Sequence, residues 1–106
     1  MAIDIRGRSD EIVDKIAGAL RSYSENHPSS SIAIYRQNSV SVRIRVVDPD
    51  FVGSDRSQRS QQVWQYLEQL PDEVHGDIST VLLLTPSETE HSFANLEFDD
   101  PVPSKL

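Results

Sequence analysis

One strictly alternating segment, residues 40–47, constrains the fold of this chain more than any other feature. Four apolar positions alternate there with four others: Val40, Val42, Ile44 and Val46 against Ser41, Arg43, Arg45 and Val47. Successive side chains of a β-strand point to opposite faces of a sheet, so the pattern predicts a strand with one buried and one solvated face. Such a sheet needs a second layer to cover its apolar face.

A shorter segment before it shows the same pattern. Residues 32–35 alternate in this way and predict a strand, and residues 37–39 (Gln-Asn-Ser) are typical of a turn. The two strands are therefore expected to form an antiparallel hairpin. We expect Tyr35 on its solvated side together with Arg43 and Arg45, although the pattern alone does not fix the register.

The stretch after the hairpin, residues 51–70, predicts a loop followed by a helix. It opens with Phe51-Val52-Gly53, and Arg56 and Arg59 stand one turn apart at the start of the helix. Arginine at this position opposes the helix dipole, which favours anions there. The apolar residues of the helix share one face: Val63, Trp64, Leu67 and Leu70. Trp64 is therefore expected to be a buried core residue.

Two further elements flank this central part. Residues 10–24 carry the apolar stripe of an amphipathic helix, with Ser9 as its N-cap and a stop at Asn26-His27-Pro28. Residues 78–85 are almost entirely apolar, which favours a strand in the sheet interior. The expected fold class is α+β, a three-stranded mixed sheet with helices on one face, in the order α-β-β-α-(turn/α)-β.

The expected domain boundaries lie where these periodic patterns stop. Residues 1–8 are an N-terminal lead-in, residues 9–90 the folded domain, and residues 91–106 an acidic, flexible tail. Within that tail, Phe93 and Phe98 could still cover an apolar patch of the domain. A chain of 106 residues is long enough for one core and not for two.

Composition excludes several kinds of site and compartment. The chain has no cysteine, which excludes disulfides, thiolate metal ligands and thiol nucleophiles. No apolar run approaches the ~18 residues of a membrane span. The first residues carry charges where a secretory signal has an apolar segment. We therefore expect a cytoplasmic protein that does not act at a membrane.

Catalytic motifs give little support for an enzyme. The three histidines, His27, His75 and His91, lie in predicted loops or in the tail, and no glycine-rich phosphate loop or nucleophile elbow occurs. Glu88, Glu90 and His91 have the residue types of a metal site, but a charged tail has the same composition. His27 is interpreted as a solvated residue at a helix end. We expect a non-enzymatic protein with no cofactor and no tightly bound divalent metal.

Basic residues are concentrated in the middle of an acidic chain. The net charge is −7, yet five of the ten lysine and arginine residues fall between residues 36 and 59. Arginine forms paired hydrogen bonds with carboxylate or phosphate groups. The candidate binding residues are Tyr35, Arg43, Arg45, Arg56 and Arg59. The alternative is that each arginine pairs with a nearby acid such as Asp48, Asp50 or Asp55.

Four short motifs, in their order and spacing, resemble those of the BolA family. They are Phe51-x-Gly53, Arg56-x-x-Arg59, Val63-Trp64-x-x-Leu67 and Leu84-Thr85-Pro86-x-Glu88. The resemblance covers roughly residues 10–90. It implies a fold similar to the type II KH domain and a regulatory or stress-type protein that acts by binding.

The chain departs from this family at the residues that bind iron. The family's helix-entry histidine falls at Ser60, its second histidine falls at Asp77, and the hairpin loop has Gln37, Asn38 and Ser39. The family uses these positions to share an iron–sulfur cluster with a monothiol glutaredoxin, and serine and glutamine are poor ligands for such a cluster. We therefore expect cluster ligation to be lost. The glycine-x-x-glycine loop of KH domains is also missing, because Arg56 follows Gly53-Ser54-Asp55.

Three kinds of function remain open. The resemblance implies a regulatory binding protein whose partner is another protein. A diverged interaction module would instead dock a protein on the sheet face that carries Tyr35, Arg43 and Arg45. Nucleic-acid binding through Arg56 and Arg59 is the third, and the net charge of −7 disfavours it because an acidic protein repels a polyanion. A continuous positive face joining the four arginines would favour nucleic acid, and a mixed apolar face would favour a protein.

Overall fold

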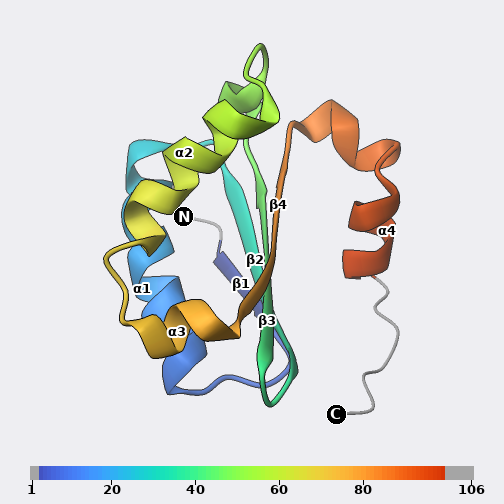
Figure 1. Cartoon of the computed structure of the whole chain (residues 1–106). Coiled ribbons are helices and arrows are strands. Elements are labelled where there is room, and N and C mark those ends of the chain that lie inside the picture. The colour runs from blue at the N-terminus through green and yellow to red at the C-terminus, as the bar shows by residue number, and fades with distance from the viewer. Residues whose placement is uncertain (1–2, 100–106) are drawn as a thin grey trace.

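The computed structural model describes residues 3–99, which form a mixed four-stranded sheet with helices on both faces (Figure 1). The strands are β1 (Ile3–Arg6), β2 (Ser31–Asn38), β3 (Ser41–Val47) and β4 (Ile78–Leu84), in that order across the sheet. β1 is parallel to β2, β2 is antiparallel to β3, and β3 is parallel to β4. β1 and β4 are therefore the two edges of the sheet.

The helices fall into two groups (Figure 1). On one face of the sheet lie α1 (Glu11–Asn26), α2 (Arg56–Leu67) and α3 (Asp72–Asp77), and on the opposite face lies α4 (Phe93–Asp99). Two short 3₁₀ helices complete the described part of the chain: η1 (Pro49–Phe51), which precedes α2, and η2 (Pro86–Glu90), which follows β4.

The predicted α+β class is confirmed, but the described sheet has four strands and not three. The additional strand, β1, comes from residues that we expected to be a lead-in. Ile3 and Ile5 align with Ile32 and Ile34 of β2. A strand of four residues carries too little periodicity to be recognised, and its parallel partner follows only after α1.

Helix α4 is the second departure from the prediction. We expected helices on one face and no regular element after His91, yet α4 forms on the other face. Its Phe98 is 2% exposed, because the ring lies 4.8 Å from the guanidinium carbon of Arg45 and 5.6 Å from that of Arg6. Residues 100–106 of the predicted tail lie outside the described residues.

The hairpin of β2 and β3 follows the prediction closely. The apolar residues that alternate along β3 are fully buried: Val42, Ile44 and Val46. Tyr35 aligns with Arg43 across the two strands, and Arg45 aligns with Ala33. Tyr35, Arg43 and Arg45 therefore share the face opposite the core. Val40 does not extend the buried row, since it lies in the turn and is 53% exposed.

The hydrophobic core lies between the sheet and the layer of α1, α2 and α3. Its largest fully buried side chains include two aromatic and five aliphatic residues: Tyr23, Phe51, Ile16, Leu20, Ile34, Ile44 and Leu67. Trp64 packs against this core but is only partly buried, so the prediction of a buried tryptophan is wrong in that respect. Within residues 3–99 no helix has the length and apolar character needed to cross a membrane.

Candidate functional site

The segment that leads into α2 is held by the residues of the Phe-x-Gly motif. Phe51 is fully buried, and Gly53 has a φ of 82°, a left-handed conformation that glycine adopts without strain. Asp55 is the N-cap of α2: its carboxylate accepts from the backbone N–H of Gln58 at 2.8 Å, and the Gln58 side chain accepts from the Asp55 N–H at 2.9 Å. The negative charge of Asp55 offsets the unfavourable position of the arginines near this helix end.

Arg59 connects three segments around the start of α2. Its guanidinium donates to the carbonyl oxygens of Ser54 at 3.1 Å, Leu83 at 3.2 Å and Phe51 at 3.2 Å. Two of its N–H groups also bind the carboxylate of Glu88, at 2.7 and 3.2 Å. The Arg59 side chain is only 13% exposed. Arg59 therefore holds the loop before α2 against β4 and η2.

Glu88, the acidic partner of Arg59, also caps η2. Its Oε1 accepts from the backbone N–H of Thr85 at 2.8 Å, and the Thr85 hydroxyl accepts from the Glu88 N–H at 3.4 Å. The hydrogen bonds from Arg59 and then from Thr85 lower the pKa of Glu88 from 4.5 to about 2. Glu88 is therefore ionised at neutral pH, and the pair is structural.

A groove of about 760 Å³ lies beside this network, between α2 and β4. Ser60 and Trp64 line it from α2, and residues 81–84 line it from β4. The Trp64 ring meets the ring of His75 edge-on, with the centroids 6.0 Å apart. A second hollow continues over the outer side of α2, lined again by Arg56, Ser60 and Trp64 together with Ser57 and Gln61. The groove is thus lined by an aromatic ring, by apolar strand residues and, at one end, by charged side chains.

The β4 wall of the groove is the edge of the sheet. Leu84 O accepts from the backbone N–H of Asp48, which follows β3, whereas Leu83 O faces outward and accepts from Arg59. Backbone groups of successive strand residues point to opposite sides, so the N–H and C=O of Val81 also point outward. Val81, Leu82 and Leu83 are each partly exposed. This edge therefore offers backbone hydrogen-bonding groups beside an apolar surface.

Of the two arginines that line the groove, Arg56 is the one that the fold leaves exposed. It is exposed, and no acid within the described part of the chain lies within ion-pair distance of it. It differs in this respect from Arg59, whose donors are taken by Glu88 and three carbonyl groups. Arg56 therefore has its guanidinium available for an anionic group of a ligand.

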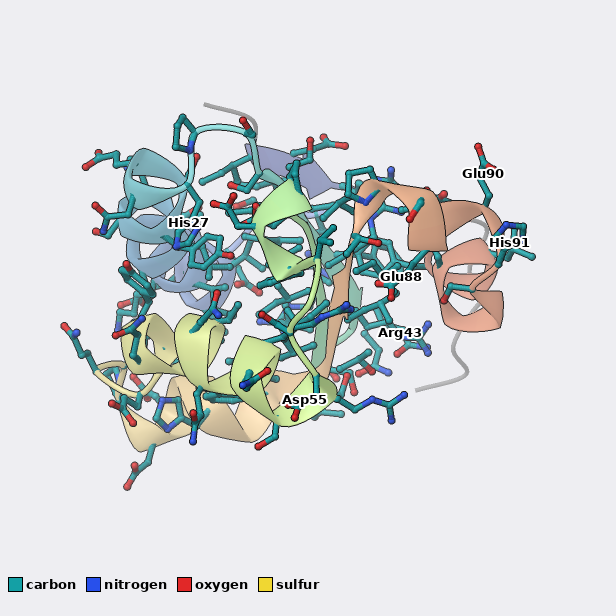
Figure 2. All side chains as sticks on the ribbon, turned by 90° about the horizontal axis from the view of Figure 1, so that it is seen from above. His27, Arg43, Asp55, Glu88, Glu90 and His91 are labelled. Atoms are coloured by element: carbon teal, nitrogen blue, oxygen red, sulfur yellow. The ribbon has the colours of Figure 1, made fainter. Side chains whose placement is uncertain are left out.

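The structure does not bring the predicted binding residues together on one surface. Tyr35, Arg43 and Arg45 lie on the α4 face of the sheet, as Figure 2 shows for Arg43, whereas Arg56 and Arg59 start a helix on the other face. The Nε of Arg43 donates to the side-chain oxygen of Gln37 at 3.0 Å. The expected single group of arginines is therefore two separate groups.

Arg45 is bound by α4 in the described structure. Its Nη1 donates to Asn95 at 2.7 Å and to Asp99 at 2.6 Å. Arg6 donates to the same carboxylate at 2.9 Å. Burial by itself would raise the pKa of Asp99, but the hydrogen bonds from Arg45 and Arg6 outweigh it and lower the pKa. The alternative that arginines pair with acids holds here, although the acid is not one of the nearby residues that we named.

The positions at which the BolA family places histidines have other contacts in this chain. Ser60 lines the groove. Asp77 accepts from Arg36 at 3.0 Å, and Arg36 also binds Asp10 at 2.9 Å. Burial by itself would lower the pKa of Arg36, but the hydrogen bonds that Arg36 donates to these two acids outweigh burial and raise the pKa. Asp77 is therefore part of an ion-pair network that connects the start of α1 to the start of β4.

A second polar cluster lies at the far end of α1, away from Glu90 and His91 (Figure 2). His27 is not the solvated residue that we expected. Its ring stacks on Tyr23 with the centroids 4.2 Å apart, and its side chain is 20% exposed. The ring nitrogen Nδ1 lies 3.2 Å from a carboxylate oxygen of Asp48 and 3.2 Å from one of Asp50.

No protein-family model matches this chain, and no curated protein matches it significantly. The functional assignment therefore depends on the geometry of the groove, on the ion pairs around it and on the motifs in the sequence.

Proposed function

We propose that this chain is a non-enzymatic, BolA-like binding protein of the regulatory type, and that its partner is another protein. The groove between α2 and β4 binds an extended peptide segment of that partner, which adds to β4 as a further strand. The observation that carries the proposal is the outward edge of β4, which faces a groove that also contains Trp64 and the exposed Arg56.

Strand addition uses the chemistry that this edge provides. An extended peptide forms main-chain hydrogen bonds with a free sheet edge, and alternate side chains enter pockets beside it. The outward N–H and C=O of Val81 are the groups that such a peptide would pair with. Trp64 provides a half-buried aromatic surface for an apolar side chain. A carboxylate of the peptide one or two residues away would bind Arg56.

Charge distribution supports a protein partner over nucleic acid. A nucleic-acid site would need several arginines on one continuous face, and here Arg45 and Arg59 are bound to Asp99 and Glu88. Arg56 shares its groove with Asp55, which adds a negative charge. Together with the net charge of −7, this leaves too little positive potential to attract a polyanion.

The BolA resemblance contributes the regulatory class of function and not the iron–sulfur chemistry. The Arg36–Asp77 ion pair occupies one of the positions where that chemistry would need a histidine. The proposed protein keeps a binding surface at the start of α2 and lacks the ligands of the cluster.

Selection of peptides from a random library against the full chain tests this function. We expect extended peptides with apolar residues flanking an acidic residue. Their affinity should fall when Arg56 is changed to Glu, and it should not fall in the matched variant Arg21→Glu, which changes an exposed arginine on α1. Equal losses in both variants would show only a general charge effect, and unchanged binding in Arg56→Glu would contradict the proposed site.

A further inference from the structure

A fully buried carboxylate lies where the end of α1 meets η1. Asp48 is 0% exposed, and its Oδ2 accepts from the hydroxyl of Tyr23 at 2.5 Å. Its Oδ1 accepts from the backbone N–H of Asp50 at 2.9 Å. Burial, followed by the hydrogen bond to Asp48, raises the pKa of Tyr23, so this hydroxyl stays protonated and orients the carboxylate.

The charge of this carboxylate is not balanced by a strong base. Buried charged groups in proteins are paired or bind metals, because an isolated charge loses its hydration. Within residues 3–99, no lysine or arginine lies within ion-pair distance of Asp48 or Asp50, and His27 is their only partner of that kind. Two carboxylates therefore face one imidazole. The C-terminal end of α1 adds further negative potential at His27, which caps the helix.

The three side chains have the spacing of a metal-ligand set. One donor atom from each lies within 4.8 Å of the others, and both carboxylate oxygens are 3.2 Å from Nδ1 of His27. Ligands bound to one metal ion at about 2.0–2.2 Å are themselves roughly 2.8–3.6 Å apart in tetrahedral or octahedral geometry. An ion could therefore be placed among these atoms with small adjustments of Asp50, whose side chain is 63% exposed.

We propose that His27, Asp48 and Asp50 form a binding site for a divalent transition-metal ion, for which Zn²⁺ is the best match. An imidazole favours Zn²⁺ over Mg²⁺ and Ca²⁺, and three protein ligands leave one position for water on the exposed side. Tyr23 acts as the outer partner that fixes Asp48. This site departs from the expectation that the chain binds no divalent metal. It is also distinct from the groove at α2.

The ion would stabilise the connection between β3 and α2. It would join the end of α1 to η1, and Phe51 of η1 is a carbonyl partner of Arg59. Because the three ligands come from two segments that are separate in sequence, the unfolded chain presents no preformed site. Binding should therefore raise the unfolding temperature.

The experiment uses the untagged full chain after treatment with a chelator. Zn²⁺ is titrated by calorimetry at neutral pH, thermal unfolding is followed with and without Zn²⁺, and Mg²⁺ serves as the comparison ion. We expect Zn²⁺ to bind and raise the unfolding temperature, and Mg²⁺ to do neither. Asp50→Asn should weaken Zn²⁺ binding by at least about tenfold, since loss of even an outer partner of a metal ligand has an effect of that size.

One test variant and one control variant make the result specific. Asp50→Asn is the test variant, because it changes an exposed side chain and is expected to fold, whereas Asp48→Asn would alter a fully buried group. The double variant Glu90→Gln with His91→Gln removes the other exposed group of metal-binding residue types and should bind Zn²⁺ as the parent does. Absence of Zn²⁺ binding in the parent overturns the proposal and leaves His27 as an ion-pair partner only. Binding that survives Asp50→Asn, or that is lost in the double variant, also overturns it.

Discussion

Replacement of Arg59 by Gln is the perturbation for which the structure gives the clearest magnitude. The change removes the guanidinium that binds Glu88 and the carbonyl oxygens of Phe51, Ser54 and Leu83. The glutamine side chain is too short to reach all four partners. The loop before α2 would then lose its attachment to β4 and η2.

The size of the effect depends on how much water the released partners regain. Breaking a buried ion pair by removing one member costs about 3–5 kcal/mol. Glu88 is 43% exposed and recovers much of its hydration, so we reduce the expected loss to about 2–3 kcal/mol. For a domain of this size, that loss lowers the melting temperature by roughly 10 °C.

Equilibrium unfolding in urea and calorimetry measure this loss in Arg59→Gln, with Arg56→Gln as the matched control. Arg56 is exposed, so its replacement should change stability by no more than about 0.5 kcal/mol. The reasoning would be refuted by a stability of Arg59→Gln equal to that of the parent. It would also be refuted if Arg56→Gln were as destabilised as Arg59→Gln.

Three further predictions concern the same contacts. The pKa of Glu88 is about 2 in the folded chain, below its ordinary value of 4.5. The contribution of ionised Glu88 to the free energy of unfolding is therefore complete above pH 4.5 and is lost as the pH falls toward 2. After a reduction for the exposure of Glu88, that contribution is about 1–2 kcal/mol, and Glu88→Gln should remove it when unfolding is compared at neutral and acidic pH. Phe98→Ala should lower the free energy of unfolding by about 2 kcal/mol. Unfolding should stay cooperative, because the core lies on the face of the sheet opposite α4. A loss of cooperativity in calorimetry would show that α4 is essential to the domain. Trp64→Ala should cost about 1–2 kcal/mol, less than the 3–5 kcal/mol typical of a buried tryptophan, and should weaken binding of the selected peptides. Full peptide affinity in that variant would remove Trp64 from the site.

Sequence patterns predicted the elements whose signal is local. The alternating residues predicted β3, and the apolar stripe predicted α1. Both patterns are visible in the sequence because buried and exposed side chains alternate at a fixed period along a half-buried element. Gly53 was predicted as a loop residue, and its left-handed φ agrees with that role. The predicted face shared by Tyr35, Arg43 and Arg45 also follows from strand periodicity.

Features that depend on contacts between distant residues were not predictable in this way. β1 is identified by its pairing with β2, and α4 by the position of Phe98 between Arg6 and Arg45. In the sequence, Asp48 was considered as a partner for a nearby arginine, and only the fold brings Tyr23 and His27 to this buried carboxylate. Proximity in sequence suggested that the arginines form one surface, whereas the sheet separates them.

The edge of β4 was missed for a related reason. A continuous apolar run such as residues 78–85 favours a strand in the sheet interior. The chain contradicts that rule because a groove lies between α2 and β4 and leaves Val81, Leu82 and Leu83 partly exposed at the edge of the sheet. The long apolar run therefore belongs to an edge strand here, and not to a central strand.

The affinity of a selected peptide for Val81→Pro, compared with Val81→Ala, tests the central claim most directly. Proline removes the outward N–H of Val81 but leaves the hydrogen bonds between β3 and β4, and edge strands tolerate it. Alanine controls for the loss of the valine side chain. We predict that Val81→Ala binds the peptide nearly as the parent does, and that Val81→Pro binds at least about tenfold more weakly, because a main-chain hydrogen bond is lost and the ring obstructs the edge. Equal affinities for the two folded variants would contradict strand addition at β4.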